Sequence, residues 1–237
     1  MRIQSDIIIP ENFRNEKELR LIIVFSRNVS YNQGMERRIC NTKPRIITRK
    51  GSITMTPALA QEKFYTIDDI YSLPEGSRAE LIDGQIIYMA PPSTKHQRIL
   101  SFLHLEIGNH IQSKKGACEV FPAPFAVFLF ADDSKYLEPD ISVICDREKL
   151  DDQGCKGAPD WVIEIVSPGS RPMDYYTKLS LYRSAGVREY WIVDPMKETV
   201  LVYDMEHDSA PAIYSFSDNI KANIYDDLWI DFRKLNL

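Results

Sequence analysis

The sequence lacks the signals that mark membrane, secreted and zinc-binding proteins. No apolar run among its 237 residues approaches the roughly 20 residues that a membrane span needs. The apolar patch at 21–25 is too short and too interrupted for a secretory signal. The four cysteines show neither Cys-x-x-Cys spacing nor nearby histidines, which argues against zinc. We therefore expect a protein of the reducing cytoplasm with no membrane partner.

The chain also lacks the excess of positive charge that is typical of nucleic-acid binders. Its formal net charge is −5 at pH 7, and the charge is unevenly divided. Residues 1–60 carry 11 Lys and Arg against 5 Asp and Glu, whereas residues 61–237 carry 18 against 29. The acidic second part counts against tight non-specific binding to DNA. A nuclease tolerates such a charge where the cleft is locally basic and a metal ion neutralises the carboxylates of the site.

Residues 1–55 differ from the rest of the chain. They are basic and follow neither the helical period of 3.6 nor the strand period of 2. Patterned sequence begins only after Met55. We expect 1–55 to be a basic N-terminal extension, either disordered or upstream of the natural start, and 56–237 to form one folded domain, which is an ordinary size for a single core.

The remaining chain alternates helical and strand patterns. A capping box opens a short helix at Thr66, and two strand-like runs flank an Asp-Gly turn within 78–89. Ser93 can cap a helix over 95–113, and a helix over 170–185, with an apolar stripe of Tyr175, Leu179 and Tyr182, ends at Gly186. Strands are predicted at 125–130, 141–145, 161–166, 190–193 and 199–203, with one or two more before 232. This order predicts an α/β (α+β) fold in which helices flank a mixed central sheet.

Two carboxylates stand where buried strands are expected. Asp140, in Glu138-Pro139-Asp140, heads the apolar run 141–145, and Glu164 lies inside the apolar run 161–166. A carboxylate in a buried strand is costly unless its charge is compensated. Two of them on neighbouring strands indicate a shared divalent cation with oxygen ligands, Mg²⁺ or Mn²⁺. The alternatives are a turn aspartate after proline and a glutamate on a solvent-facing strand.

Three further residues are candidates for the same site. Glu80, in the 78–89 hairpin, can approach the sheet edge, although an exposed hairpin glutamate would look the same. Lys178 can hold the attacking water and stabilise the added negative charge of the pentavalent phosphate. Its alternative is a solvated lysine in a surface ion pair with Asp174 at i−4. His96 can contact substrate, or be a partly exposed polar residue at a helix start.

An ordered set of motifs resembles the Uma-type restriction-endonuclease-like family of the PD-(D/E)XK nuclease superfamily. The matching segments cover about 62–235 and lie around five positions, which are Glu80-Leu81-Ile82-Asp83-Gly84, His96-Gln97, Glu138-Pro139-Asp140, 162–168 and 178–195. The resemblance implies a restriction-endonuclease-like αβββαβ core within 56–237, with Asp140 and Glu164 as magnesium ligands and Glu80 as an accessory acid. The superfamily places a lysine two residues after the second acid, where this chain has Val166, so the resemblance assigns that role to Lys178.

These observations lead to one main hypothesis and two rivals. We expect a magnesium-dependent endonuclease that hydrolyses DNA phosphodiester bonds, with DNA as its partner and a homodimer where both strands are cut together. Val166 and the acidic composition motivate a catalytically inactive nuclease-fold module that binds or regulates. The third hypothesis is a metal-dependent hydrolase of another phosphoester.

Overall fold

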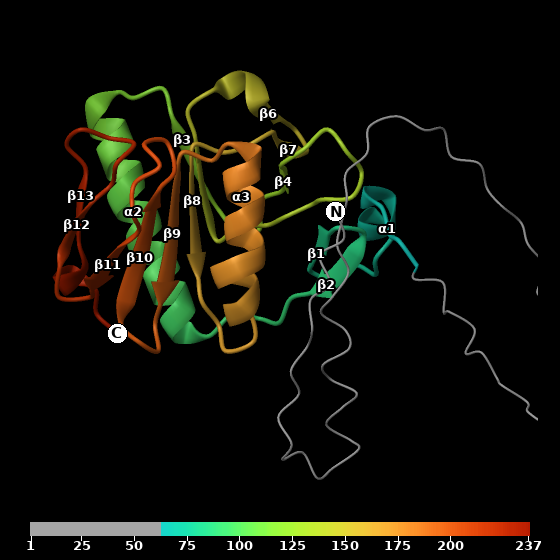
Figure 1. Cartoon of the computed structure of the whole chain (residues 1–237), viewed down its shortest axis with the longest axis horizontal. Coiled ribbons are helices and arrows are strands. Elements are labelled where there is room, and N and C mark those ends of the chain that lie inside the picture. Colours follow the sequence, from blue (N-terminus) through green and yellow to red (C-terminus); the bar gives the residue numbers. More distant parts are fainter. Residues whose placement is uncertain (1–62) are drawn as a thin grey trace, which may run out of the picture. The chain divides into compact units, whose positions relative to one another are not determined.

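The computed structural model describes residues 63–237, and the expected extension over 1–55 lies outside the described residues. The domain division therefore stays a prediction. The chain from Lys63 onward forms the helices and strands labelled in Figure 1. The helices are α1 (Ile67–Tyr71), α2 (Thr94–Lys114), η2 (Arg147–Lys149), η3 (Met173–Lys178), α3 (Leu179–Ala185) and η4 (Phe232–Lys234). The strands are β1 (Ala79–Ile82), β2 (Gln85–Tyr88), β3 (Glu119–Pro122), β4 (Val127–Phe128), β5 (Ile141–Ile144), β6 (Leu150–Asp151), β7 (Gly154–Lys156), β8 (Trp161–Ile165), β9 (Glu189–Asp194), β10 (Thr199–Asp204), β11 (Ala212–Ser215), β12 (Asn219–Lys221) and β13 (Trp229–Asp231).

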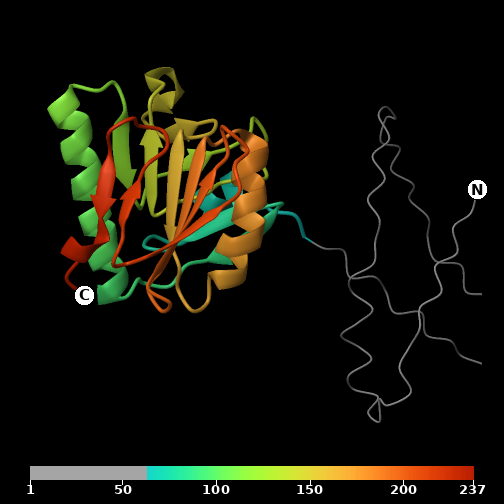
Figure 2. The same cartoon turned by 60° about the vertical axis from the view of Figure 1, so that its left-hand side comes forward.

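A six-stranded mixed sheet forms the centre, in the order β11-β10-β9-β8-β5-β3. Only β8 and β9 pair in parallel, and the other neighbours are antiparallel. The helix α2 covers one face of this sheet, and α3 covers the other (Figures 1 and 2). The order α2, β3, β5, β8, α3, β9 is the expected αβββαβ core, so the predicted fold is confirmed.

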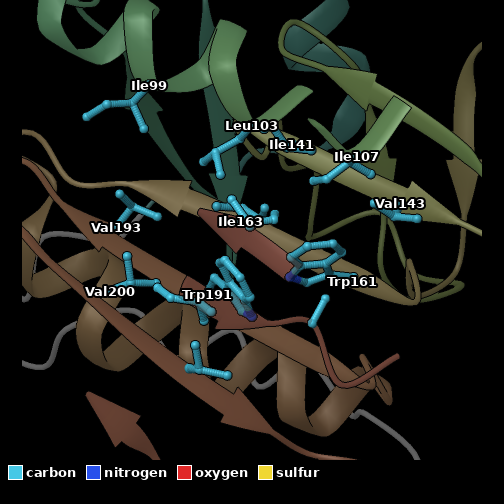
Figure 3. Packing of buried hydrophobic residues seen from close by; sticks show 14 of the residues in the cluster. Ile99, Leu103, Ile107, Ile141, Val143, Trp161, Ile163, Trp191, Val193 and Val200 are labelled. Carbon is cyan, nitrogen blue, oxygen red and sulfur yellow. The ribbon is translucent and has the colours of Figure 1, made fainter. Parts of the chain in front are cut away.

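Strand β8 is apolar on both faces because both faces are covered. Trp161, Ile163 and Ile165 pack with Ile99, Leu103 and Ile107 of α2, as Figure 3 shows for the labelled residues of this cluster. Val162 and Val166 pack on the opposite face with Tyr182 of α3. Side chains alternate along a strand, so Glu164 projects toward the α3 face. A carboxylate is thereby carried into the interior.

The strand predicted at 125–130 is wrong as a member of the central sheet. Only Val127 and Phe128 form a strand, β4, and it belongs to a separate three-stranded sheet with β7 and β6. The strand that pairs with β5 at this edge of the sheet is β3, whose residues are all partly buried. As an edge strand that ends in proline, β3 lacks the continuous apolar run that marks a central strand. Within 125–130, Val127 and Leu129 belong to the apolar cluster beneath α3, which also contains Tyr182. Phe128 instead packs with Ala79 and Leu81 of β1.

The helices follow the predicted pattern with one change. Helix α2 begins after Ser93, whose side chain accepts a hydrogen bond from the His96 amide at 3.2 Å, as the capping prediction requires. The helix predicted over 170–185 begins as π-helix at η3 and continues as α3, and it ends at Gly186 with φ 91°. Glycine has no Cβ penalty in that left-handed conformation. Within residues 63–237, no helix has the length and apolar character to cross a membrane.

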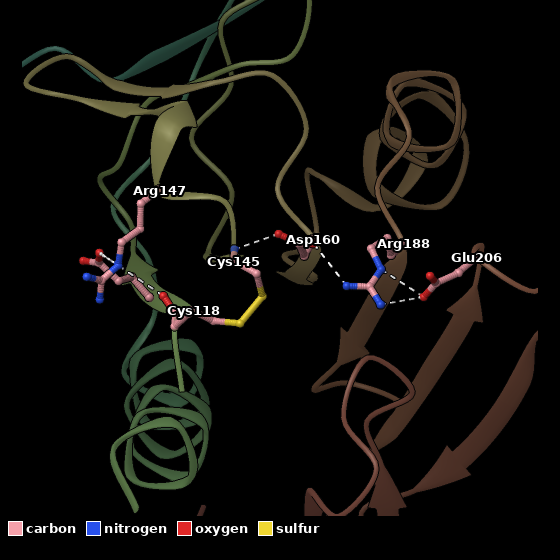
Figure 4. The surroundings of a disulfide bond; sticks show 8 residues. Cys118, Cys145, Arg147, Asp160, Arg188 and Glu206 are labelled. Atoms are coloured by element: carbon pink, nitrogen blue, oxygen red, sulfur yellow. Dashed lines mark hydrogen bonds and ion pairs between the residues drawn. A yellow bond between two sulfur atoms is a disulfide. The ribbon is translucent and has the colours of Figure 1, made fainter. Parts of the chain in front are cut away.

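A disulfide links Cys118, immediately before β3, to Cys145, immediately after β5 (Figure 4). Asp140 precedes β5 and so lies at the other end of this strand. Beside it, the Cys145 amide donates to Asp160 Oδ2 at 2.7 Å, and Asp160 Oδ1 accepts from Arg188 at 3.2 Å. Reducing compartments disfavour such bonds. The expected cytoplasmic location stays a prediction.

Candidate active site

A cleft of about 910 Å³ opens at the edge of the sheet where β5 begins and β8 ends. It is walled by the β1–β2 hairpin, the first turn of α2, the Glu138–Pro139–Asp140 segment and the chain from the end of β8 into η3. All five residues predicted from the sequence line it, namely Glu80, His96, Asp140, Glu164 and Lys178. Segments that are far apart in the chain therefore meet at one place.

Strand register sets the two acids side by side. Strands β5 and β8 are antiparallel, and the register ends with Ile141 opposite Ile163. Asp140 and Glu164 adjoin this last pair, one on each side. Asp140 Oδ2 accepts a hydrogen bond from the Ile165 amide at 2.8 Å, which fixes its carboxylate against the end of β8. Adjacent strands were predicted for this pair, and the pairing confirms that placement.

Lys178, at the end of η3, contacts two acids of the cleft, Glu164 and Glu80. Its Nζ lies 2.9 Å from Glu164 Oε1 and 2.9 Å from Glu80 Oε1, and all three side chains are buried. Val166, at the superfamily's usual lysine position, is buried in the apolar cluster beneath α3. The ammonium that contacts Glu164 thus comes from η3 and not from β8. Neither a solvated lysine nor an exposed Glu80 describes these residues.

Glu80, Glu164 and Lys178 form a buried polar network with two further residues, which the sequence did not indicate as site residues. Asp174 is 2% exposed, lies 3.9 Å from the Lys178 ammonium and accepts from Ser170 Oγ at 2.6 Å. The Tyr182 hydroxyl donates to Glu164 Oε1 at 2.6 Å. The surface ion pair considered for Asp174 and Lys178 is wrong, because both are buried. The available signal was the spacing of Ser170, Asp174, Lys178 and Tyr182, four residues apart on one helical stripe.

The network carries more negative than positive charge. Burial lowers the pKa of Lys178, but Glu164, Glu80 and Asp174 together raise it well above its usual value, so the amine stays protonated. Burial raises the pKa of Glu164 well above its usual range, partly offset by Lys178 and reinforced by Asp174, Asp140 and Glu80. One ammonium facing several carboxylates leaves the site short of positive charge. A proton or a metal ion would supply it.

His96 lies deeper than the sequence indicated. It is 9% exposed, and its Nε2 lies 3.1 Å from Asp140 Oδ2. Its Nδ1 is buried and has no hydrogen-bond partner within residues 63–237. The hydrogen bond from its amide to Ser93 fixes the start of the helix that carries it. His96 is therefore part of the polar lining of the cleft.

The carboxylate oxygens left free suit a hard cation. Asp140 Oδ1, Glu80 Oε2 and Glu164 Oε2 have no hydrogen-bond partner among the described residues. In that part of the chain no group of three or more His, Cys, Asp or Glu is arranged to hold a metal. Mg²⁺ needs only one or two carboxylates, since water and substrate phosphate fill its other positions. Asp140 and Glu164 fit that requirement.

Comparisons with known proteins agree with this architecture. The family model described as "Uma2: Putative restriction endonuclease" matches residues 62–232. The "Uncharacterized protein slr1290" of Synechocystis sp. (strain ATCC 27184 / PCC 6803 / Kazusa) is 25% identical over 168 residues, which are 70% of this chain and 85% of the relative. A crystal structure titled as a putative nuclease belonging to DUF820 from Anabaena variabilis ATCC 29413 has 25% identity and a TM-score of 0.59. It covers 72% of this chain and 96% of that one. With a nuclease-like fold and a family match over most of its length, the chain belongs to the Uma2 family, described as "Putative restriction endonuclease".

Proposed function

We propose that the protein is a magnesium-dependent endonuclease that hydrolyses phosphodiester bonds of DNA. The observation that carries this proposal is the contact of the Lys178 ammonium with Glu164 at 2.9 Å, beside the Asp140 carboxylate in one cleft. Two acids with free oxygens next to a buried ammonium form a donor set suited to phosphoryl chemistry. The family description and the nuclease neighbour support the same class of reaction.

In this mechanism Asp140 and Glu164 would hold Mg²⁺ or Mn²⁺, which when bound would supply positive charge for the phosphate and lower the pKa of a water molecule. Lys178 is protonated, so it acts as a hydrogen-bond donor and not as a general base. It orients the attacking water and stabilises the negative charge that develops on the phosphate. Glu80 accepts from the Lys178 ammonium and from the Glu138 amide, at 2.9 and 3.1 Å, and thereby aims the lysine. His96, in contact with Asp140, lines the same cleft and is proposed to contact the substrate.

Cleavage of supercoiled plasmid DNA in Mg²⁺ tests the proposal. Asp140→Ala, Glu164→Ala and Lys178→Met should each lower the rate by about 100-fold or more, as the loss of one electrostatic group does elsewhere. Asp208→Ala removes an exposed carboxylate away from the cleft and should leave the rate unchanged. Activity that survives both Asp140→Ala and Glu164→Ala would rule out this centre. Sedimentation of the protein with and without DNA would test for the proposed homodimer.

One observation favours a second candidate, a nuclease-fold module that binds without turnover. The Lys178 ammonium already donates to Glu80 and Glu164 and lies 3.9 Å from Asp174, so two of its three donors are engaged before substrate arrives. Calorimetry with Mg²⁺ separates the two, because absence of binding at low millimolar concentration favours the inactive module. Parallel assays on RNA and on nucleotide phosphoesters test the hydrolase of another phosphoester.

A further inference from the structure

Arg78 is a cleft residue to which neither the sequence nor the proposed mechanism assigns a role. It lies immediately before β1, on the same side of the strand as Glu80, and it lines the cleft. Its Nε and Nη2 both donate to Glu138 Oε2, at 3.0 and 2.8 Å. The Glu138 side chain is 9% exposed and the Arg78 side chain is 34% exposed. One edge of the guanidinium is therefore anchored while the rest remains open to solvent.

The anchor is itself held by the site. Glu138 Oε1 accepts from the Tyr136 hydroxyl at 2.9 Å, and the Glu138 amide donates to Glu80 Oε1 at 3.1 Å. Glu80 Oε1 also contacts the Lys178 ammonium. A chain of direct contacts thus runs from the guanidinium to the proposed catalytic lysine. A change in the position of Arg78 would therefore also shift Glu138, which lies two residues before Asp140.

The free edge of Arg78 suits a phosphate. Nη1 has no hydrogen-bond partner among the residues that the structure describes, and Arg78 lines the cleft, so this nitrogen is free to bind a ligand there. The other cations of the cleft are more committed, since Lys178 contacts three acids and Lys95 donates to the Pro195 carbonyl at 2.8 Å and lies 3.6 Å from Glu198. A planar guanidinium with one edge fixed is pre-organised to bind phosphate oxygens with the other.

We infer that Arg78 binds a backbone phosphate of the DNA strand in the cleft, next to the phosphodiester that is cleaved, with Glu138 as its positioning residue. This inference rests on the proposed function. The cleft is lined by several carboxylates, which repel the DNA backbone. A cation that binds a neighbouring phosphate would offset this repulsion and hold the strand at the site. The competing explanation is that the Arg78–Glu138 ion pair only stabilises the position of the β1–β2 hairpin.

Binding of a fluorescently labelled oligonucleotide, followed by anisotropy with Ca²⁺ in place of Mg²⁺, tests the inference separately from hydrolysis. Arg78→Ala should weaken binding by about 10-fold and reduce the salt dependence of the affinity by about one unit of slope. Arg183→Ala is the matched control, since Arg183 pairs with Asp208 at 3.0 Å outside the cleft. It should leave both quantities unchanged. Arg78→Lys keeps the positive charge but loses the planar pair of donors that a guanidinium offers to a phosphate. This variant should bind DNA more weakly than the parent protein and unfold at the same temperature.

Each result decides a different claim. Equal affinities for Arg78→Ala and Arg183→Ala overturn the inference, and so does a parent protein that binds no DNA. Full affinity in Arg78→Lys, together with a lower melting temperature in Arg78→Ala, reduces Arg78 to a hairpin fastener and also overturns it. A parent protein that binds through Arg78 but cuts no substrate supports the inference and contradicts the proposed hydrolysis. A parent protein that cuts DNA with an unchanged KM in Arg78→Ala contradicts the inference alone.

Discussion

Asp174 is a buried carboxylate whose ionisation costs the folded state free energy. Burial raises its pKa from 3.8 to about 6, although Lys178 and Ser170 act in the opposite direction. A carboxyl group that holds its proton more tightly when folded favours folding below the unfolded pKa, and this advantage is lost as pH rises through the folded pKa. Relative to the parent protein, the free energy of unfolding of Asp174→Asn should therefore rise by roughly 2–3 kcal/mol between about pH 4 and about pH 7.

Urea denaturation in EDTA at several pH values measures this difference. EDTA is needed because a bound cation would change the charge balance around Asp174. Asp208→Asn serves as the control for the loss of one acidic group, since Asp208 is largely exposed. A pH-dependent gain in Asp174→Asn no larger than that in Asp208→Asn would contradict the proposed burial of an ionised carboxylate.

The burial and the neighbours of some site residues could be predicted from the sequence, and those of others could not. Asp140 and Glu164 could be predicted to lie together because each places a charge within or at the head of an apolar strand, and such a charge needs a partner. Glu80 and Lys178 could not be separated from exposed residues, because their burial depends on a hairpin and a helix closing over the same sheet edge. For the same reason the sequence offered Asp174 only as the partner of Lys178 in an alternative surface pair, although the residue is buried. Local sequence does not encode that closure.

At the scale of elements, the start of α2 is a point where helix stability and site geometry depend on one hydrogen bond. Ser93 Oγ accepts from the His96 amide, and His96 carries the ring that contacts Asp140. Ser93→Ala should lower the free energy of unfolding by about 1 kcal/mol, because an N-terminal amide loses its partner. Ser93→Asp restores an acceptor and should recover most of the loss. Thermal unfolding of both, beside Ser101→Ala on the exposed middle of α2, checks this. A loss in Ser101→Ala as large as that in Ser93→Ala would contradict it.

Elements with strong periodic patterns were predictable, and those defined by their neighbours were not. The long amphipathic pattern of α2, the capped helix before Gly186 and the doubly buried β8 all lie where the sequence indicated. The central-sheet strand predicted at 125–130, in place of which the structure has β3, shows what such patterns cannot predict. An apolar run reports burial and does not report which sheet buries it, whereas β3 is specified by its pairing with β5.

At the scale of the whole molecule, the site is assembled only by the fold, because its residues come from the first hairpin, α2, β5, β8 and η3. The unfolded chain brings none of these carboxylates together, so a cation that binds between them binds the folded state preferentially. At a Mg²⁺ concentration 100 times its dissociation constant, linkage stabilises the fold by about 2.7 kcal/mol. For a domain of this size the melting temperature should rise by roughly 5–10 °C.

The stabilisation should depend on pH and on the two acids. Since burial raises the pKa of Glu164 well above its usual range, protons compete with the cation in acid, and the increase in melting temperature should be larger near pH 8 than near pH 5. Asp140→Asn and Glu164→Gln should each abolish most of it, whereas Asp208→Asn should retain it in full. Differential scanning fluorimetry at constant ionic strength, with Mg²⁺ replaced by Na⁺ in the reference, measures the effect. An equal increase in all three variants would mean that Mg²⁺ acts on the surface charge of the acidic domain and that the cleft is not its site.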